Sequence, residues 1–252
     1  MSPLDRRFWA EGPGSFALAV GLALLVRWAF FEAYVIPSTS MLPALLVHDH
    51  IFVNKIIYGI RVPFSDRWLV RWNDPQRGEI IVFRSKSAPD QYFIKRIAGL
   101  PGDRVVFENG NLYVNEKLVE KTIPQRLKDE WGWLNDGDFP GEAAAGGLAN
   151  YVQWEEHLGE KDYSILLRKE GGSPGTFGPV TVPVGHYLVL GDNRDNSQDS
   201  RTWNEDSRFV PRGQLIGRAS RVWLSCESTL PVVTFLCNPL TIRWRRFLHP
   251  VE

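Results

Sequence analysis

The longest stretch of apolar residues lies near the start of the chain, from Phe16 to Ile36, with few charges within it. As a helix this stretch would be about 31 Å long, close to the thickness of the hydrocarbon core of a bilayer. The pattern therefore predicts a transmembrane helix over residues 16–36, preceded by a cytoplasmic N-terminus over residues 1–15.

Two features of the flanking sequence favour an uncleaved anchor. Arg6 and Arg7 precede the apolar run, and positive residues favour the cytoplasmic side of a membrane. The small-x-small pair that a signal-peptide cleavage site requires is missing just after the run. We therefore expect a single-pass protein whose N-terminus is cytoplasmic and whose residues beyond Ile36 are extracytoplasmic.

Beyond residue 36, short apolar segments rich in β-branched and aromatic residues follow one another, as is typical of β-strands. Because no long helices separate these segments, the predicted fold class is mainly β, with antiparallel sheets. Asn109-Gly110 is a strong signal for a hairpin turn, since both positions accept positive φ. Strands are expected at residues 51–58, 79–83, 92–98, 103–108, 111–115, 163–169, 186–190 and 216–223.

The chain divides by composition into a β core and an insertion. Residues 37–108 and 184–225 are assigned to the core, and residues 109–183 to an inserted β and loop subdomain. Within it, residues 121–160 contain tryptophans, glycines and an alanine-glycine tract, which favours loops over core sheet. The C-terminal tail, residues 226–252, holds a short apolar piece and several arginines. For this tail a membrane-interfacial segment and a simple edge strand both stay open.

Charge and cysteine content narrow the function classes. Lys+Arg and Asp+Glu are balanced at 29 each, so net charge gives no support for nucleic-acid binding. Cys226 and Cys237 fit no zinc-binding spacing. They can form a disulfide in an oxidising compartment or remain two buried thiols, and the sequence does not separate these alternatives.

The segment Ile36–Pro43, directly after the predicted anchor, holds two serines between two prolines that prevent a continuous helix. A serine is a poor nucleophile unless a base takes its proton. None of the five histidines has nucleophile-elbow or metal-ligand spacing. His48-Asp49-His50 is more typical of a solvent-facing strand start than of a metal site. A Ser-His-Asp triad is not visible, although triads are defined in space.

Lys95 is the other candidate base, and it must be neutral to act as one. In the predicted strand 92–98 it shares a face with Phe93 and Ile97, where burial would lower its pKa. Lowering this pKa by two to three units would cost about 3–4 kcal/mol. A lysine on a solvated strand face is the alternative.

A dense polar loop, Asn193–Arg201, follows the strand that ends at Gly191-Asp192. A calcium loop of the EF-hand type is disfavoured, because Ser200 stands where that loop needs glycine. The loop instead offers Ser197 as a hydrogen-bond partner for a lysine amine. Its carboxylates and arginines can fix its shape.

Four segments together resemble the conserved boxes of bacterial type I signal peptidase, the leader peptidase. They are Pro37-Ser-Thr-Ser-Met41, Ile51-Phe-Val-Asn-Lys55 with Tyr58-Gly59, Tyr92–Asp103 and Gly191–Arg201. They occur in the family's order. The resemblance implies the signal-peptidase, LexA-like β fold.

The resemblance also implies roles by position. Ser40 corresponds to the nucleophile and Lys95 to the general base. Ser38, with the Ser40 N–H, corresponds to the oxyanion hole. Supporting residues in the loop are Ser197, which orients the lysine, and Asp192, Arg194, Asp199 and Arg201. The substrate subsites are expected at Ile36, Pro37, Leu45, Phe93 and Ile94.

The implied activity is removal of signal peptides from exported preproteins, after small-x-small (Ala-x-Ala) sites, by a monomeric endopeptidase at the bacterial inner membrane. No cofactor or metal is implied, and the partners are preproteins and the lipid bilayer. A self-cleaving repressor-type Ser-Lys protease and a catalytically silent membrane adaptor are the alternatives. Three departures from the family pattern are Thr39, Ala44 and the extra residues 204–208, which create a second Asp-Ser-Arg. The site role is assigned to residues 199–201.

Overall fold

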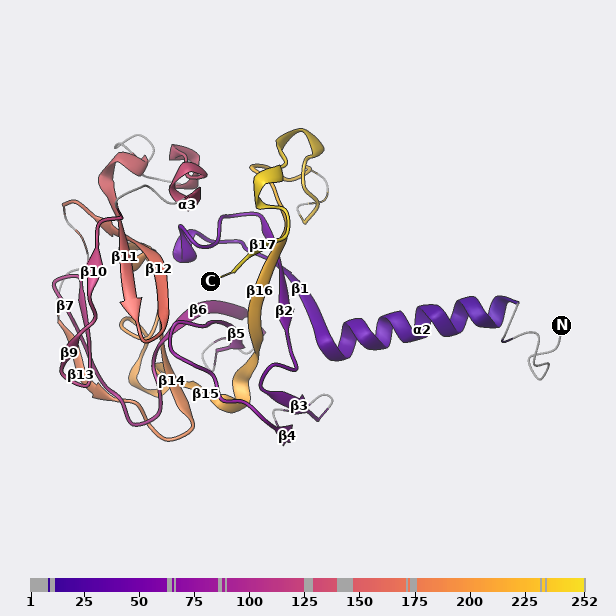
Figure 1. The fold of residues 1–252 in the computed structure, drawn as a ribbon, viewed down its shortest axis with the longest axis horizontal. Helices are drawn as coiled ribbons and strands as arrows, with labels where there is room; N and C mark the ends of the chain where they lie inside the picture. Colours follow the sequence, from indigo (N-terminus) through magenta and orange to yellow (C-terminus); the bar gives the residue numbers. More distant parts are fainter. Residues whose placement is uncertain are drawn as a thin grey trace.

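The computed structural model describes residues 9, 12–62, 65, 67–85, 88, 90–124, 129–139, 147–170, 172, 176–231, 233 and 235–251. Figure 1 shows a body made of β-sheets, from which helix α2, Pro13–Phe30, projects. The expectation of a mainly β protein with antiparallel sheets is confirmed.

The predicted helix over residues 16–36 is wrong in its extent. Helix α2 covers Pro13–Phe30, and the chain then becomes strand β1, Phe31–Val35. Aromatic and β-branched residues favour a strand here, and β1 pairs along its length with the exposed edge of β2, Asp49–Asn54. The Glu32 carboxylate also lies 3.2 Å from Lys55 Nζ. Among the described residues, no helix combines the length and apolar character needed to cross a membrane.

The largest sheet carries the residues of the predicted core. Its strand order is β1-β2-β16-β5-β6-β14-β15, and β17 adds to β16. The bounds of these further strands are β16 Leu215–Ser225, β5 Ile80–Arg84, β6 Tyr92–Gly99, β14 His186–Leu190, β15 Val210–Pro211 and β17 His249–Pro250. Strands far apart in the sequence thus lie side by side, which brings the segments before and after the insertion together.

Two smaller sheets form the other side of the body (Figure 1). One has the order β13-β7-β8-β9 and the other β10-β11-β12, and a hairpin, β3–β4, stands apart. Their strands are β3 Gly59–Arg61, β4 Trp68–Arg71, β7 Arg104–Glu108, β8 Asn111–Val114, β9 Lys117–Leu118, β10 Lys121–Thr122, β11 Tyr151–Leu158, β12 Lys161–Arg168 and β13 Phe177–Thr181.

The predicted hairpin is confirmed, since Asn109 and Gly110 have φ of 50° and 76° between β7 and β8. Residues 121–160 hold more strand than expected: β11 is an eight-residue strand. The described helices here and elsewhere are short, namely α3 Asp129–Gly132 and the 3-10 turns Thr39–Met41, Asp136–Asp138, Gly147–Asn150, Arg194–Asn196, Glu205–Ser207, Arg212–Gln214, Pro239–Thr241 and Trp244–Arg246.

Cys226 and Cys237 form a disulfide, with sulfur atoms 2.08 Å apart. The bond joins the end of β16 to the C-terminal segment. The expectation that His48-Asp49-His50 is a solvent-facing strand start is wrong, because Asp49 and His50 are buried and the three side chains have separate partners. His48 Nδ1 lies 3.3 Å from the Glu227 carbonyl oxygen, Asp49 pairs with Arg246, and His50 Nε2 lies 3.5 Å from Cys237 Sγ.

Candidate active site

The proline-flanked segment forms a tight turn against the main sheet. Ser38 is extended, with φ −135° and ψ 160°, and Thr39–Met41 then make one turn of 3-10 helix. Pro37 and Ser38 are exposed, whereas Ser40 and Met41 are buried. The turn therefore directs the second serine inward and leaves the first at the surface.

Strand β6 brings Lys95 to this turn. The Lys95 Nζ atom lies 2.7 Å from Ser40 Oγ and 3.0 Å from the Ile94 carbonyl oxygen. Only 4% of Lys95 is exposed. The two residues that the sequence singles out, 55 positions apart, are therefore in hydrogen-bond contact, and both are buried.

Burial lowers the pKa of Lys95 from 10.5 to about 8, against the opposing effect of the Asp199 and Asp192 carboxylates. A buried ammonium group loses its hydration, so the neutral amine is favoured. Arg201 also disfavours a second positive charge nearby. A substantial fraction of the amine is consequently neutral slightly above pH 7, as a proton acceptor must be.

Both carboxylates near Lys95 are held by arginines. Arg96 Nε and Nη2 each donate to Asp192 at 2.8 Å, and both side chains are fully buried. Arg201 donates to the two oxygens of Asp199 at 2.9 and 2.8 Å. Such bidentate pairs fix geometry and neutralise charge. The acids therefore shape the loop without providing Lys95 with a dedicated counter-ion.

A third buried pair joins the loop to the insertion. Arg194 Nη1 donates to Glu156 Oε1 at 2.7 Å, and Tyr163 donates its hydroxyl proton to Glu156 Oε2 at 2.5 Å. Burial raises the pKa of Glu156, but Arg194 outweighs burial and holds it below its usual range. Glu156 is not predictable from the sequence, because the composition of residues 121–160 favours loops and no local motif points to this carboxylate.

Two asparagines of the loop hold the serine turn directly. The Asn193 N–H donates to the Ser40 carbonyl at 3.2 Å, and its Nδ2 donates to the Thr39 carbonyl at 3.2 Å. Asn196 Nδ2 donates to Thr39 Oγ1 at 2.9 Å. These asparagines lie in a recognised box but were assigned no role. Thr39, a departure from the family pattern, thus gains a hydrogen bond that glycine would lack.

The C-terminal tail supports the turn from the other side. Arg246 is fully buried and donates Nε to Asp49 Oδ1 at 3.2 Å and Nη2 to the Ala44 carbonyl at 3.0 Å. Asp49 Oδ2 in turn accepts the Leu46 N–H at 2.8 Å. The segment after the serine is therefore held by a residue more than 200 positions away, which sequence spacing could not indicate.

Ser38 lies beside Ser40, whereas Ser197 makes no hydrogen bond to Lys95. Ser38 Oγ lies 3.3 Å from Ser40 Oγ, at the mouth of the site. The expected bond from Ser197 to the lysine amine is absent: Ser197 Oγ is buried without a regular hydrogen bond. It lies near the Asp199 carboxylate instead and helps to lower its pKa.

The expected subsite residues are only partly brought together. Ile36, Leu45 and Ile94 are buried in one apolar cluster with Met41. Pro37, which directly follows Ile36 in the chain, is exposed. Phe93 packs in a different cluster, where its ring stacks on Phe83 and meets Trp203 edge-on.

The second Asp-Ser-Arg lies in a surface turn. Asp206 is exposed, and Arg208 pairs with Glu205 at 3.8 Å. Among the described contacts of Lys95 and Ser40, none involves residues 204–208. The geometry therefore favours residues 199–201 as the segment that supports the site.

A neutral lysine amine that contacts a buried serine hydroxyl can accept its proton and make the oxygen nucleophilic. Together with a hydroxyl at the mouth of the site, this arrangement is suited to acyl transfer. The antiparallel sheets and the Ser40–Lys95 contact thus fit a serine hydrolase.

The chain belongs to the signal peptidase family, peptidase S26, whose pattern it matches over residues 9–224. This confirms the resemblance found in the four sequence boxes. The chain is accordingly an enzyme of the serine endopeptidase class.

Relatives named signal peptidase I cover most of the chain. That of Pseudomonas aeruginosa is 39% identical over 84% of this chain and 71% of its own length. That of Rickettsia felis is 33% identical over 86% of this chain and 80% of its own. A solved signal peptidase I of Enterococcus faecalis is 29% identical, covering 58% of this chain and 97% of its own, with a TM-score of 0.31.

Gly191→Ala should inactivate the enzyme. A Cβ atom at Gly191 would lie 2.5 Å from the Ser40 carbonyl oxygen and 2.2 Å from Ser197 Oγ, so the serine turn or the loop must move. A displacement of about 1 Å costs on the order of 100-fold in rate. Gly132→Ala, where a Cβ meets nothing within 4 Å, is the matched control. Wild-type kcat/KM in Gly191→Ala would contradict this packing.

The pH dependence of peptide cleavage should follow Lys95. If Lys95 is the base, only its neutral amine can accept the serine proton, so kcat/KM should rise with pH through a midpoint of about 8 and then level off. Measurement of kcat/KM from acid to alkaline pH checks this expectation. A kcat/KM profile with its midpoint at about 6.5 would indicate that a histidine is the base.

Proposed function

We propose that this protein removes N-terminal signal peptides from exported preproteins, with Ser40 as nucleophile and Lys95 as general base. The observation that carries the proposal is the 2.7 Å contact between Lys95 Nζ and Ser40 Oγ in a buried site. Membership in the signal peptidase family supports the substrate class. The chain supplies the dyad and its supporting loop by itself, which favours action as a monomer.

An extended substrate has a place to bind beside the dyad. In the described structure, β1 pairs on one side only, with β2. Residues 92–95 of β6 pair only with β5, because β14 joins β6 from Arg96 onward. The rings of Tyr34 and Tyr92, 5.2 Å apart, bring these two edges close together. A peptide strand between them would gain main-chain hydrogen bonds and reach Ser40.

The apolar residues next to the dyad support cleavage after small residues. Ile36, Leu45 and Ile94 are closely packed around the serine turn, and their surfaces offer no partner for a polar side chain. We propose that they line subsites for the small residues of an Ala-x-Ala site. Pro37, exposed at the start of the turn, adjoins them, whereas Phe93 packs against Phe83 and Trp203.

The reaction would proceed as acyl transfer. Lys95 Nζ takes the Ser40 hydroxyl proton while Ser40 Oγ attacks the scissile carbonyl carbon. The Ser40 N–H and the Ser38 hydroxyl donate to the resulting oxyanion. As the C–N bond breaks, the Lys95 ammonium gives its proton to the leaving amine. Lys95 then activates the water that releases the signal peptide from Ser40.

We propose that the enzyme works at the bacterial cytoplasmic membrane, with α2 in contact with lipid. Helix α2 exposes large apolar side chains, among them Phe16 (74% exposed) and Leu22 (61%). An exposed apolar helix of this kind favours a membrane contact. In the C-terminal tail, Leu240 and Trp244 are also exposed, which is consistent with an interfacial position.

The disulfide supports an extracytoplasmic position for the catalytic domain. Structural disulfides such as Cys226–Cys237 persist mainly in oxidising compartments. The substrate class requires the same side, because signal peptides are removed where exported chains emerge. The intact dyad and the match to an enzyme family give no support to a silent adaptor or a self-cleaving repressor.

Cleavage of a preprotein with an Ala-x-Ala site tests the proposal. Ser40→Ala and Lys95→Ala should each lose at least about 1000-fold in kcat, since one removes the nucleophile and the other its base. Gel analysis and N-terminal sequencing of the product would show the cleaved position. Lys117→Ala, an exposed residue of β9, should retain activity. Equal activity of all three variants would exclude the dyad.

A further inference from the structure

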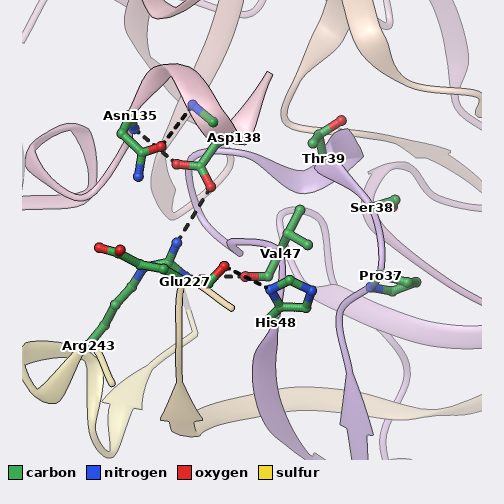
Figure 2. Close-up of a pocket in the computed structure, with 10 residues that line it drawn as sticks. Pro37, Ser38, Thr39, Val47, His48, Asn135, Asp138, Glu227 and Arg243 are labelled. Carbon is green, nitrogen blue, oxygen red and sulfur yellow. Dashed lines mark hydrogen bonds and ion pairs between the residues drawn. The ribbon is translucent and has the colours of Figure 1, made fainter. Parts of the chain in front are cut away.

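A pocket of about 440 Å³ adjoins the serine turn, and Pro37, Ser38 and Thr39 form part of its lining. Three separate parts of the chain build its walls: residues 37–39 with 47–48, residues 135–138 of the insertion, and Glu227 with Arg243 of the C-terminal segment. Figure 2 shows Ser38 and Thr39 on one side and Asp138, Glu227 and Arg243 across from them. The pocket therefore reaches Ser38, the residue proposed to hold the oxyanion.

The position of the pocket indicates which residues of a substrate, those before or those after the scissile bond, could reach it. No residue of β1 or β6, the two strands with unpaired edges, lines it. It lies instead beyond the end of β1, where the chain continues through Pro37 to Ser38 and Thr39. If the residues before the cleavage site lie between the strand edges, the chain that continues past Ser40 would be directed toward this pocket.

The walls of the pocket are rigidly held. Arg243 Nη1 donates to the Cys226 and Val47 carbonyls at 2.8 and 3.2 Å, and its Nη2 lies 3.6 Å from Asp138 Oδ1. Asp138 Oδ2 accepts the Asn135 N–H at 2.9 Å. The disulfide fixes the segment that carries Glu227. A pocket with such supports is formed before a substrate arrives.

The charges of the pocket sum to a negative value. Arg243 and Asp138 offset each other, whereas the Glu227 side chain is exposed and pairs with no cation in the described part of the chain. Burial raises the pKa of Asp138, and the nearby Asp49 and Glu227 carboxylates add to this effect. A positive or hydrogen-bond-donating group would therefore be favoured near Glu227, and a carboxylate would be repelled.

Resting on the proposed function, we infer that this pocket binds the first residues of the mature protein, directly after the scissile bond. The negative charge of Glu227 would disfavour an acidic side chain at one of those positions. The same site would receive the α-amino group that cleavage releases. The insertion and the C-terminal segment would then determine which residues are accepted after the cleavage site. The apolar subsites would separately determine which residues are accepted before it.

Peptides with an Ala-x-Ala site and Lys, Gln or Glu at each of the first three following positions test this inference. Wild type should cleave the Lys peptide with a kcat/KM about two- to fivefold above that of the Glu peptide at one or more positions, the range expected for an exposed charge pair. Glu227→Gln should remove this preference, and Glu227→Lys should reverse it.

Glu116→Lys is the matched control, because Glu116 is 80% exposed in the turn after β8, paired with Arg104, and lines no part of the pocket. It should keep the wild-type ratio at every position. Ratios that do not change with residue 227 would overturn the inference while leaving the proposed function intact. Failure of wild type to cleave even the Gln peptides would instead overturn the proposed function, and the inference with it.

Discussion

The contact between a lysine amine and a serine hydroxyl in a buried site sets the requirements for the rest of the structure. A pKa of about 8 in place of 10.5 means that the protein destabilises the charged amine by about 3 kcal/mol. Desolvation supplies this effect only if nearby negative charge does not cancel it. Asp192 and Asp199 lie close enough to favour the charged form, and each is held in a bidentate pair with an arginine. By pairing with these carboxylates, the arginines offset the negative charge that favours the charged amine.

Removing one partner of such a buried pair is strongly destabilising, because the other charge is left without compensation. The pairs Arg96–Asp192 and Arg194–Glu156 therefore link the site to β6 and to the insertion, and Arg246–Asp49 links it to the C-terminal tail. Segments that look like additions to a β core are thus part of what holds Ser40 in place. The same insertion and tail form the pocket beyond Ser38.

The sequence was informative wherever the signal was local. Strand 186–190 and the Asn109-Gly110 turn were predicted correctly, because alternation and turn chemistry depend on neighbours in the chain. The Ser40–Lys95 contact was implied by the resemblance to type I signal peptidase, which assigns these two positions to the nucleophile and its base. The helix predicted to continue to Ile36 instead ends at Phe30, since pairing with β2 outweighed local apolar character. Glu156 and Arg246 could not be found, because their partners lie 38 and 197 positions away.

Titration of the Lys95 amine itself tests the central claim most directly. In protein labelled with ¹³C-lysine, the Lys95 side-chain signal can be assigned by its disappearance in Lys95→Met and followed by NMR from neutral to alkaline pH. A midpoint of about 8, well below that of the exposed lysines, is the result expected from the buried geometry. A titration midpoint of about 10.5, the ordinary value for lysine, would show that the Lys95 amine is charged at neutral pH. That result would contradict its role as the base.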